Sequence, residues 1–412
     1  MRNQVLPVRL PTWKFPTSEW FAYEELTVFL LPITGIAVAF TLLPIGADKY
    51  DMVAYFKPWM AIVQERGLAS LSSEFADYTP PYIYLLYAAS WLVPLVGTVA
   101  AIKLINLPFI ALLSVAIYQT VLFSTESRRG AATAAAVACV TPTVLVNAFA
   151  WGQTDCIYTA FLAWSVLFAV RRQPAAAAAM FGVSVGFKLL AMFLLPLLLY
   201  LILAKQMKVW HLLLVPTAYV LMMVPAAIAG RPWGELVTIY VGQFDFFSKL
   251  AIEAPNPWKI IGALELIDYR TGVFIGFAAA AVTTLTIAIS ALRLQPGART
   301  ILLVATLSAA LMPYLLPKMH DRYFFVADVM TLTLAFVNPR LWATLPLFQV
   351  GSLLAYMAYF HLSVRGPVLG ILPITFGVGI LTLAYVRAHI GRTASVAQTT
   401  PMPASPFRAM IS

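Results

Sequence analysis

Residues 300–338 read TILLVATLSAALMPYLLPKMHDRYFFVADVMTLTLAFVN. Two apolar runs, near 300–316 and 323–338, are separated here by the polar motif 318–323. Because a membrane crossing takes about 20 mostly apolar residues, this pattern predicts two helices that cross a membrane and a short loop between them. Charge close to the membrane is costly and is usually retained for function. The stretch therefore predicts a helical hairpin whose loop carries functional residues.

Composition extends this interpretation to the whole chain. It has 412 residues, of which 61% are hydrophobic and 11% are charged, whereas soluble proteins carry about 25% charged residues. An all-α polytopic membrane protein is the class that fits. The net charge of +10 is spread over short loops, which excludes nucleic acid as a partner. Cys139 and Cys156 lie in or beside apolar runs without metal-ligand spacing, so we expect both to pack in the core.

Loop charge predicts the topology, because short basic loops stay cytoplasmic. The basic loops are Arg128-Arg129, Arg171-Arg172, Lys205 with Lys208, Arg293 with Arg299, Arg340, and Arg387 with Arg392. If all these loops are cytoplasmic, an even number of spans must lie between one basic loop and the next. This condition holds if the first span is Leu26–Ile45 and the short segment 82–96, which contains Pro94, does not cross. This pairing predicts roughly 12 crossings with both termini in the cytoplasm.

The same topology divides the chain into parts. We expect a cytoplasmic segment 1–25, a membrane domain 26–390, and a disordered cytoplasmic tail 393–412 rich in Ala, Ser, Thr and Pro. Two large extracytoplasmic loops are expected at 47–98 and 230–270. Within the first of these, apolar residues recur at helical spacing from Met52 to Val63, which predicts an amphipathic helix lying at headgroup depth.

Six polar motifs interrupt the apolar chain, and the predicted topology brings them to one side of the membrane. They are 48–51 (DKYD), 77–82 (DYTPPY), 151–155 (WGQTD), Lys188, 256–258 (NPW) and 318–323 (KMHDRY). Their shared side indicates one polar site built between helices.

Structural interpretations of these motifs stay open beside the functional one. Asp48 or Asp51 could cap a helix, and the paired prolines after Asp77 favour a rigid helix entry. Trp151 could be an interface anchor, and Lys188 could extend to the interface. The bases of the 318–323 motif could pair with nearby acids.

The functional interpretation rests on position and charge. Asp51 opens the amphipathic helix, so its carboxylate would stand at a fixed place, as a general base requires. Lys318, His320 and Arg322 fall within five residues on an outward loop, where loop orientation does not explain them. Such a cluster suits a phosphate or pyrophosphate. Further cationic candidates are Lys103, Arg231 and Lys259.

These motifs, in this order, resemble the GT-C superfamily of polytopic glycosyltransferases, and most closely the bacterial enzymes that use polyprenyl-phosphate sugars, such as mannosyltransferases. The resemblance covers residues 46–323. The family's second motif is usually Asp-Tyr-Pro-Pro, whereas Thr79 here replaces the first proline and the pair falls one place later. The last motif is more often Met-His-Glu-Arg-Tyr, so Asp321 is a conservative departure.

The resemblance implies a GT-C fold and an inverting transfer of a sugar, with a mannose-like hexose favoured, from a polyprenyl-phosphate donor to a glycan or lipid-linked acceptor. It implies a catalytic base at Asp51, with Asp48 in reserve, and a bacterial inner membrane with the site facing the periplasm or exterior. The implied substrate-binding residues are Asp77, Tyr78, Tyr82, Gln153, Asp155, Asn256 and Trp258. The implied donor-phosphate residues are Lys103, Lys188, Lys318, His320 and Arg322.

No cofactor is expected. Some members of the superfamily use a divalent metal, but nothing in this sequence demands one, and there is no metal-ligand motif and no phosphate-binding glycine loop. The alternative functions are a secondary transporter or lipid flippase and a non-catalytic membrane subunit. A transporter would concentrate its charges near the membrane midplane, whereas the motifs here fall in loops.

Overall fold

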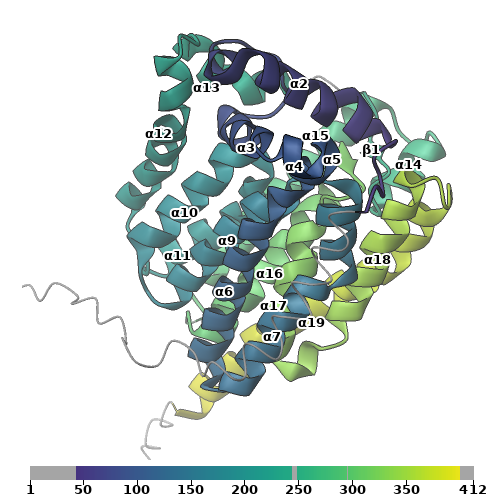
Figure 1. The fold of residues 1–412 in the computed structure, drawn as a ribbon. Coiled ribbons are helices and arrows are strands. Elements are labelled where there is room, and N and C mark those ends of the chain that lie inside the picture. Colours follow the sequence, from purple (N-terminus) through teal and green to yellow (C-terminus); the bar gives the residue numbers. More distant parts are fainter. Residues whose placement is uncertain (1–42, 244–247, 295, 400–412) are drawn as a thin grey trace, which may run out of the picture.

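The structure is a computed structural model that describes residues 43–243, 248–294 and 296–399, with side chains to 242 and from 248 to 390. Within these residues the chain is almost entirely helical (Figure 1). The first part forms a group of short helices at one end of the molecule. They are η1 (Met52–Phe56), α2 (Lys57–Arg66), η2 (Gly67–Ser72), α3 (Pro80–Ser90), α4 (Val93–Val96) and α5 (Thr98–Leu104).

Longer helices, with short helical turns between them, form a bundle beneath this group (Figure 1). In the first half they are α6 (Asn106–Thr125), α7 (Arg128–Val140), α8 (Pro142–Val144), η3 (Leu145–Trp151), α9 (Asp155–Val170), α10 (Pro174–Phe187), η4 (Leu189–Leu194), α11 (Leu195–Leu203), η5 (Val209–Leu213) and α12 (Leu214–Ile228). In the second half they are α15 (Tyr269–Ser290), α16 (Ala298–Leu315), α17 (Phe325–Val337), η6 (Pro339–Leu341), α18 (Thr344–Tyr359) and α19 (Gly366–Thr399).

Between α12 and α15 the chain forms a second group of short elements. They are α13 (Trp233–Gln243), β1 (Ala251–Ile252) and α14 (Pro257–Ala263). Strand β1 pairs in parallel with β2 (Met319–His320), with Ala251 opposite Met319 and Ile252 opposite His320. The second extracytoplasmic loop expected from the sequence is therefore tied to the motif between α16 and α17.

Seven helical segments in the described part are long and apolar enough to cross a membrane: Thr98–Thr125, Arg128–Trp151, Val209–Ile228, Tyr269–Ser290, Ala298–Leu315, Pro339–Tyr359 and Gly366–Ile390. Four shorter apolar helices lie where further spans were expected: Asp155–Val170, Pro174–Phe187, Leu189–Leu203 and Phe325–Val337. The chain is an all-α polytopic membrane protein. The expected first span, Leu26–Ile45, lies outside the described residues except for its last three.

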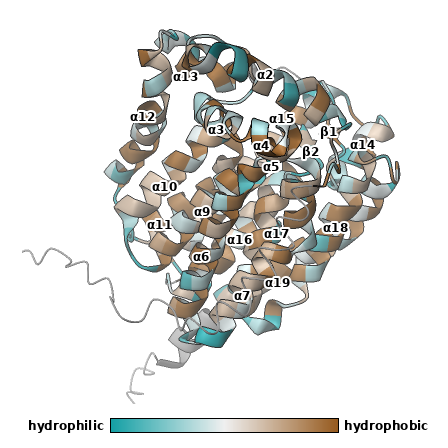
Figure 2. Cartoon of the chain, viewed as in Figure 1, coloured by the Kyte–Doolittle hydropathy of each residue, from teal (hydrophilic) through white to brown (hydrophobic). Residues whose placement is uncertain are grey.

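The outward surface of the bundle is that of a membrane protein. Only 11% of the Val209–Ile228 span and 28% of the Tyr269–Ser290 span are buried in the protein. Large apolar side chains project from both, including Leu221, Ile228 and Phe274, which are 64%, 81% and 74% exposed. Figure 2 shows hydrophobic ribbon over most of the bundle, with hydrophilic segments toward its ends. An apolar surface of this extent requires lipid, because water would make it an aggregation site.

The two ends of the bundle differ in charge. Helix α7 leads through α8 and η3 to Trp151, and α9 begins at Asp155, so both place the WGQTD motif at the same end. That end also holds Lys188, after α10, and the loop between α16 and α17. The opposite helix ends carry Arg128-Arg129, Arg171-Arg172, Arg299 and Arg340. The motif loops and the basic loops therefore lie at opposite ends of the bundle.

The predicted helix at 52–63 is present as η1 and α2, but its apolar face does not meet lipid headgroups. Phe56 and Trp59 are buried, and their rings lie 6.1 Å and 6.4 Å from the ring of Tyr82 on α3. The helix is therefore packed on the protein. At the other end of the chain, α19 continues to Thr399, into the tail expected to be disordered from 393. Prolines first occur at 401, so nothing in 393–399 prevents helix; residues 400–412 lie outside the described part.

Candidate functional site

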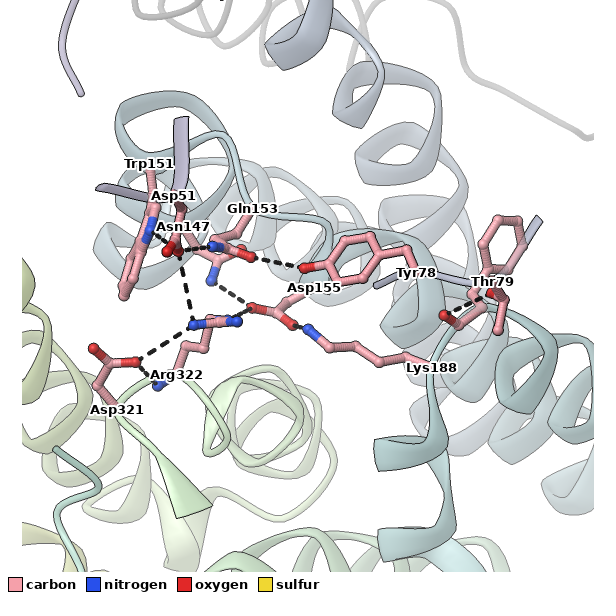
Figure 3. A network of polar contacts seen from close by, with 11 residues as sticks. Asp51, Tyr78, Thr79, Asn147, Trp151, Gln153, Asp155, Lys188, Asp321 and Arg322 are labelled. Carbon is pink, nitrogen blue, oxygen red and sulfur yellow. Dashed lines mark hydrogen bonds and ion pairs between the residues drawn. The ribbon is translucent and has the colours of Figure 1, made fainter. Parts of the chain in front are cut away.

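A network of charged and polar side chains joins the motif loops at one end of the bundle (Figure 3). Its ionisable members come from four separate places: Asp51 before η1, Asp155 at the start of α9, Lys188 after α10, and Arg322 before α17. The network brings together motifs that lie up to 271 positions apart in sequence, between residues 51 and 322. The network contains residues of five of the six predicted motifs, and the NPW motif is not among them.

Asp51 is held through one carboxylate oxygen. Its Oδ2 accepts hydrogen bonds from Trp151 Nε1 at 2.9 Å and Gln153 Nε2 at 2.5 Å. The Asp51 backbone N–H donates to the Tyr359 hydroxyl at 3.0 Å. Tyr359 in turn stacks on Trp151, with ring centroids 3.8 Å apart. Among the described residues Oδ1 has no hydrogen bond or ion pair, and the side chain is 16% exposed, so this oxygen is available to accept a proton.

The WGQTD turn depends on Gly152. Its φ of +80° lies in the left-handed region that glycine adopts freely. A Cβ here would also stand 2.9 Å from the terminal methyl of Met52, which would have to shift. The backbone N–H groups of Gly152 and Gln153 both bond to the Asn147 carbonyl. The turn thereby points Trp151 and Gln153 at Asp51.

Asp155 is the centre of the network and is completely buried. Its Oδ1 lies 2.6 Å from Lys188 Nζ, and its Oδ2 accepts from Asn147 Nδ2 at 2.8 Å. Arg322 Nε lies 3.6 Å from the same Oδ2. The position at the N-terminus of α9 favours a negative charge because the helix dipole is positive there. Asp155 is thus a fully engaged carboxylate, unlike Asp51.

Lys188 occupies a break between two helices. Helix α10 ends at Phe187 because Lys188 is extended, with φ −156° and ψ 130°, and a helix end leaves carbonyls without partners. The Thr79 hydroxyl donates to the Gly186 carbonyl at 2.7 Å, and the Tyr240 hydroxyl donates to that of Val185 at 2.5 Å. These two bonds stabilise the break. A proline at position 79 would have no hydroxyl for this role.

Aromatic rings surround the Lys188 ammonium. It lies 5.6 Å from the ring centroid of Tyr78, 5.5 Å from Tyr158 and 6.0 Å from Tyr323. Cations are attracted to such ring faces. Tyr78 also donates to Gln153 Oε1 at 3.2 Å, which connects the proline motif to the amide that binds Asp51.

Arg322 is positioned by the chain that precedes it. Pro317 has no N–H, so the Pro313 carbonyl lacks its usual helical partner; Asn256 Nδ2 donates to it instead at 2.9 Å. Trp258 Nε1 donates to the Leu315 carbonyl at 2.7 Å. The NPW motif therefore supplies hydrogen-bond donors to carbonyls at the proline-rich end of α16. The β1–β2 pairing then fixes Met319 and His320, which follow that end.

The two residues that precede Arg322, His320 and Asp321, have shifted pKa values. Burial, with the positive charges of Arg322 and Lys188, holds the pKa of His320 well below its usual range, so the ring is neutral at pH 7. Burial raises the pKa of Asp321 to about 7, against the opposing effect of Arg322. Of the three basic or titratable groups predicted on this loop, His320 is therefore a neutral ring and adds no positive charge.

The remaining predicted residues lie apart from this network. Asp48 and Asp77 are exposed, and Tyr82 is buried among the aromatic residues beneath α2. The Lys103 ammonium donates to the carbonyls of Leu43 and Ile45 at 2.9 Å and 2.8 Å. Here Lys103 fixes the entry to the first loop.

Three further cationic candidates also lie elsewhere. Lys318 lies over the ring of Tyr269 at 5.6 Å. Arg231 is within 3.5 Å of Glu74 and 3.4 Å of Glu235. Lys259 is 2.6 Å from Glu253.

Sequence reasoning missed two members of the network, Asn147 and Tyr359. Asn147 had a signal, because an amide inside the apolar run 131–149 needs a polar partner. Tyr359 had none, since a tyrosine near the end of an apolar span is ordinarily an interface residue. In the described part of the chain, no group of three His, Cys, Asp or Glu side chains is arranged to hold a metal ion.

No family model matches this chain, and no curated protein matches it in sequence.

Proposed function

We propose that this protein is an inverting glycosyltransferase that takes a sugar from a polyprenyl-phosphate donor. The proposal includes the GT-C fold, roughly 12 crossings, and a site on the extracytoplasmic side of a bacterial inner membrane. The observation that carries it is the state of Asp51: one carboxylate oxygen is anchored by two neutral donors and the other is available. A base needs this combination of fixed geometry and an accessible lone pair.

The reaction is a single displacement. An acceptor hydroxyl on a glycan or glycolipid loses its proton to Asp51 Oδ1 as its oxygen attacks the anomeric carbon of the donor sugar. The bond from that carbon to the phosphate oxygen breaks, and the lipid phosphate leaves with the electron pair. Attack from the side opposite the leaving group inverts the anomeric centre. The leaving group is already activated, so one base and a source of positive charge suffice.

Arg322 and Lys188 are the proposed partners of the donor phosphate. Both belong to the network that contains Asp51, and Arg322 Nη1 lies 4.0 Å from Asp51 Oδ2. A guanidinium can bind two phosphate oxygens at once. His320 would contribute a neutral ring N–H. These groups lie at helix ends beside the first loop, which supports an enzyme at the membrane surface over a transporter with charges at the midplane.

The test is a transfer assay on purified protein with a panel of polyprenyl-phosphate sugars, beginning with mannose. Asp51→Asn keeps an oxygen that can accept from Trp151 and Gln153 but removes the basicity, so turnover should fall about 10²–10⁴-fold. Asp48→Asn is the matched control, since Asp48 is exposed, and it should change turnover less than about twofold. Full activity in both variants would remove the first-loop base; loss in Asp48→Asn alone would transfer the role to Asp48.

A further inference from the structure

The balance of charges in the network affects how it can bind an anionic ligand. The cluster holds three carboxylates, Asp51, Asp155 and Asp321, against two permanent cations, Lys188 and Arg322. His320 is neutral. The carboxylates therefore already neutralise both cations, and a phosphodiester would add one more negative charge to a buried site, where an uncompensated charge is costly.

Of the three carboxylates, Asp321 accepts the fewest hydrogen bonds among the described residues, one against two each for Asp51 and Asp155. Asp155 has Lys188 at 2.6 Å, whereas the nearest cation to Asp321 is Arg322 Nη1 at 3.8 Å. That guanidinium also faces Asp51 and Asp155. Within the described part of the chain, the Asp321 carboxylate accepts one hydrogen bond, from the Arg322 backbone N–H at 2.9 Å, and the residue is only 6% exposed.

The groups that face Asp321 allow it to change charge. They are Arg322 in its own turn, Asp51 from the first loop, Asp155 from α9 and the buried hydroxyl of Tyr356 from α18. Two of them are like charges that favour the protonated form. With a pKa of about 7, Asp321 carries a proton about half the time at neutral pH.

We propose, on the basis of the donor chemistry set out above, that the phosphodiester donor enters this site together with a proton, which Asp321 takes up. The incoming negative charge replaces the carboxylate charge beside Arg322, so the cluster keeps its balance and the guanidinium becomes available to the phosphate. Asp321 is thus a positioning residue for the donor. It acts through Arg322 and touches neither the sugar nor the acceptor.

Proton uptake by Asp321 predicts how the affinity for the diester depends on pH. Below about pH 7 Asp321 is already protonated, so affinity for the diester should be constant. Above it, free protein must take up a proton to bind, and the Kd should rise by up to about tenfold per pH unit until the pKa of the complex is reached.

The experiment uses farnesyl methyl phosphate, a diester whose single charge does not change in this pH range, with the full-length protein in detergent and EDTA. Calorimetry in two buffers of different ionisation enthalpy at pH 7.5 counts the protons, and titrations from pH 6 to 9 give the Kd. We expect wild-type protein to take up a substantial fraction of one proton. Asp321→Asn, which is neutral at every pH, should take up none and should bind with a pH-independent Kd.

His320→Gln is the matched control, because His320 is a second titratable group in the same turn as Asp321 and Arg322. It should keep the proton uptake and the slope, and loss of both in this variant would assign the proton to His320 and overturn the inference. A pH-independent Kd in the wild type would overturn the inference while leaving the proposed function intact. No binding of the diester at any pH would overturn both.

Discussion

Replacing Lys188 tests how strongly the network holds together, and it needs no substrate. Lys188→Met keeps most of the side-chain volume but leaves the Asp155 carboxylate completely buried. That carboxylate would retain the Asn147 amide at 2.8 Å and Arg322 Nε at 3.6 Å, and the second contact is too long for a hydrogen bond. We therefore expect destabilisation, because a buried charge has lost its closest counter-ion.

The magnitude follows from the 2.6 Å separation of Lys188 Nζ and Asp155 Oδ1. At an effective dielectric constant of about 20, two unit charges at this distance attract by about 6 kcal/mol before the cost of desolvation. Measured losses on removing one partner of a buried pair are about 3–5 kcal/mol. Arg322 remains nearby, so we expect the lower value. Asp155→Asn combined with Lys188→Met removes both charges and should cost much less than the sum of the single changes.

The assay is the free energy of unfolding in mixed micelles titrated with dodecyl sulfate. The matched control is Lys259→Met, since the Lys259 Nζ to Glu253 Oε1 distance is also 2.6 Å but these side chains are 21% and 41% exposed. An exposed pair contributes about 0–1 kcal/mol. The reasoning is refuted if the two lysine variants lose equal free energies of unfolding, or if the losses add in the Asp155 and Lys188 double variant. Either result would show that burial does not increase the contribution of this pair to stability.

Three further predictions concern topology and the loop that carries Arg322. A cysteine introduced at Gln64 should react with an impermeant maleimide added outside intact cells, and one introduced at Ser127 should not. The wild-type protein is the blank, because both native cysteines are buried. The reverse labelling pattern would invert the proposed orientation. Asn256→Ala leaves the Pro313 carbonyl unbonded and should lower the free energy of unfolding by about 1–3 kcal/mol in the micelle titration. Gly276→Val places a Cβ 2.5 Å from the Pro317 ring, so it should weaken diester binding in calorimetry, and unchanged affinity would show that α15 does not position the loop.

Much of the helical architecture could be predicted because apolar runs and helix breaks are local properties. The expected spans near 300–316 and 323–338 correspond to α16 and α17. The periodicity of 52–63 also predicted a helix correctly. The prediction was wrong about what covers the apolar face, because a 3.6-residue period shows which face is apolar but not whether protein or lipid covers it. Phe56 and Trp59 pack on Tyr82, where lipid was expected.

The site could be predicted only in part. Loop charge was enough to bring Asp51, Gln153, Asp155 and Arg322 to one end of the bundle. It could not show that Lys103 binds backbone carbonyls, because the role of a lysine depends on atoms far away in sequence. The raised pKa of Asp321 likewise follows first from its burial, with a smaller contribution from the Asp51 and Asp155 carboxylates, and sequence spacing reveals neither.

The bond from the Asp51 backbone to the Tyr359 hydroxyl spans 308 positions. All six motifs lie before residue 324, yet the residue that supports the proposed base lies on α18, near the end of the chain. A nascent chain synthesised through Tyr323 contains Asp51, Asp155, Lys188 and Arg322 but lacks Tyr359. During synthesis the contacts of Asp51 can therefore be completed only after α18 has inserted. A nascent or truncated chain would carry every motif, and the Trp151 and Gln153 donors to the carboxylate, without the bond that holds the Asp51 backbone.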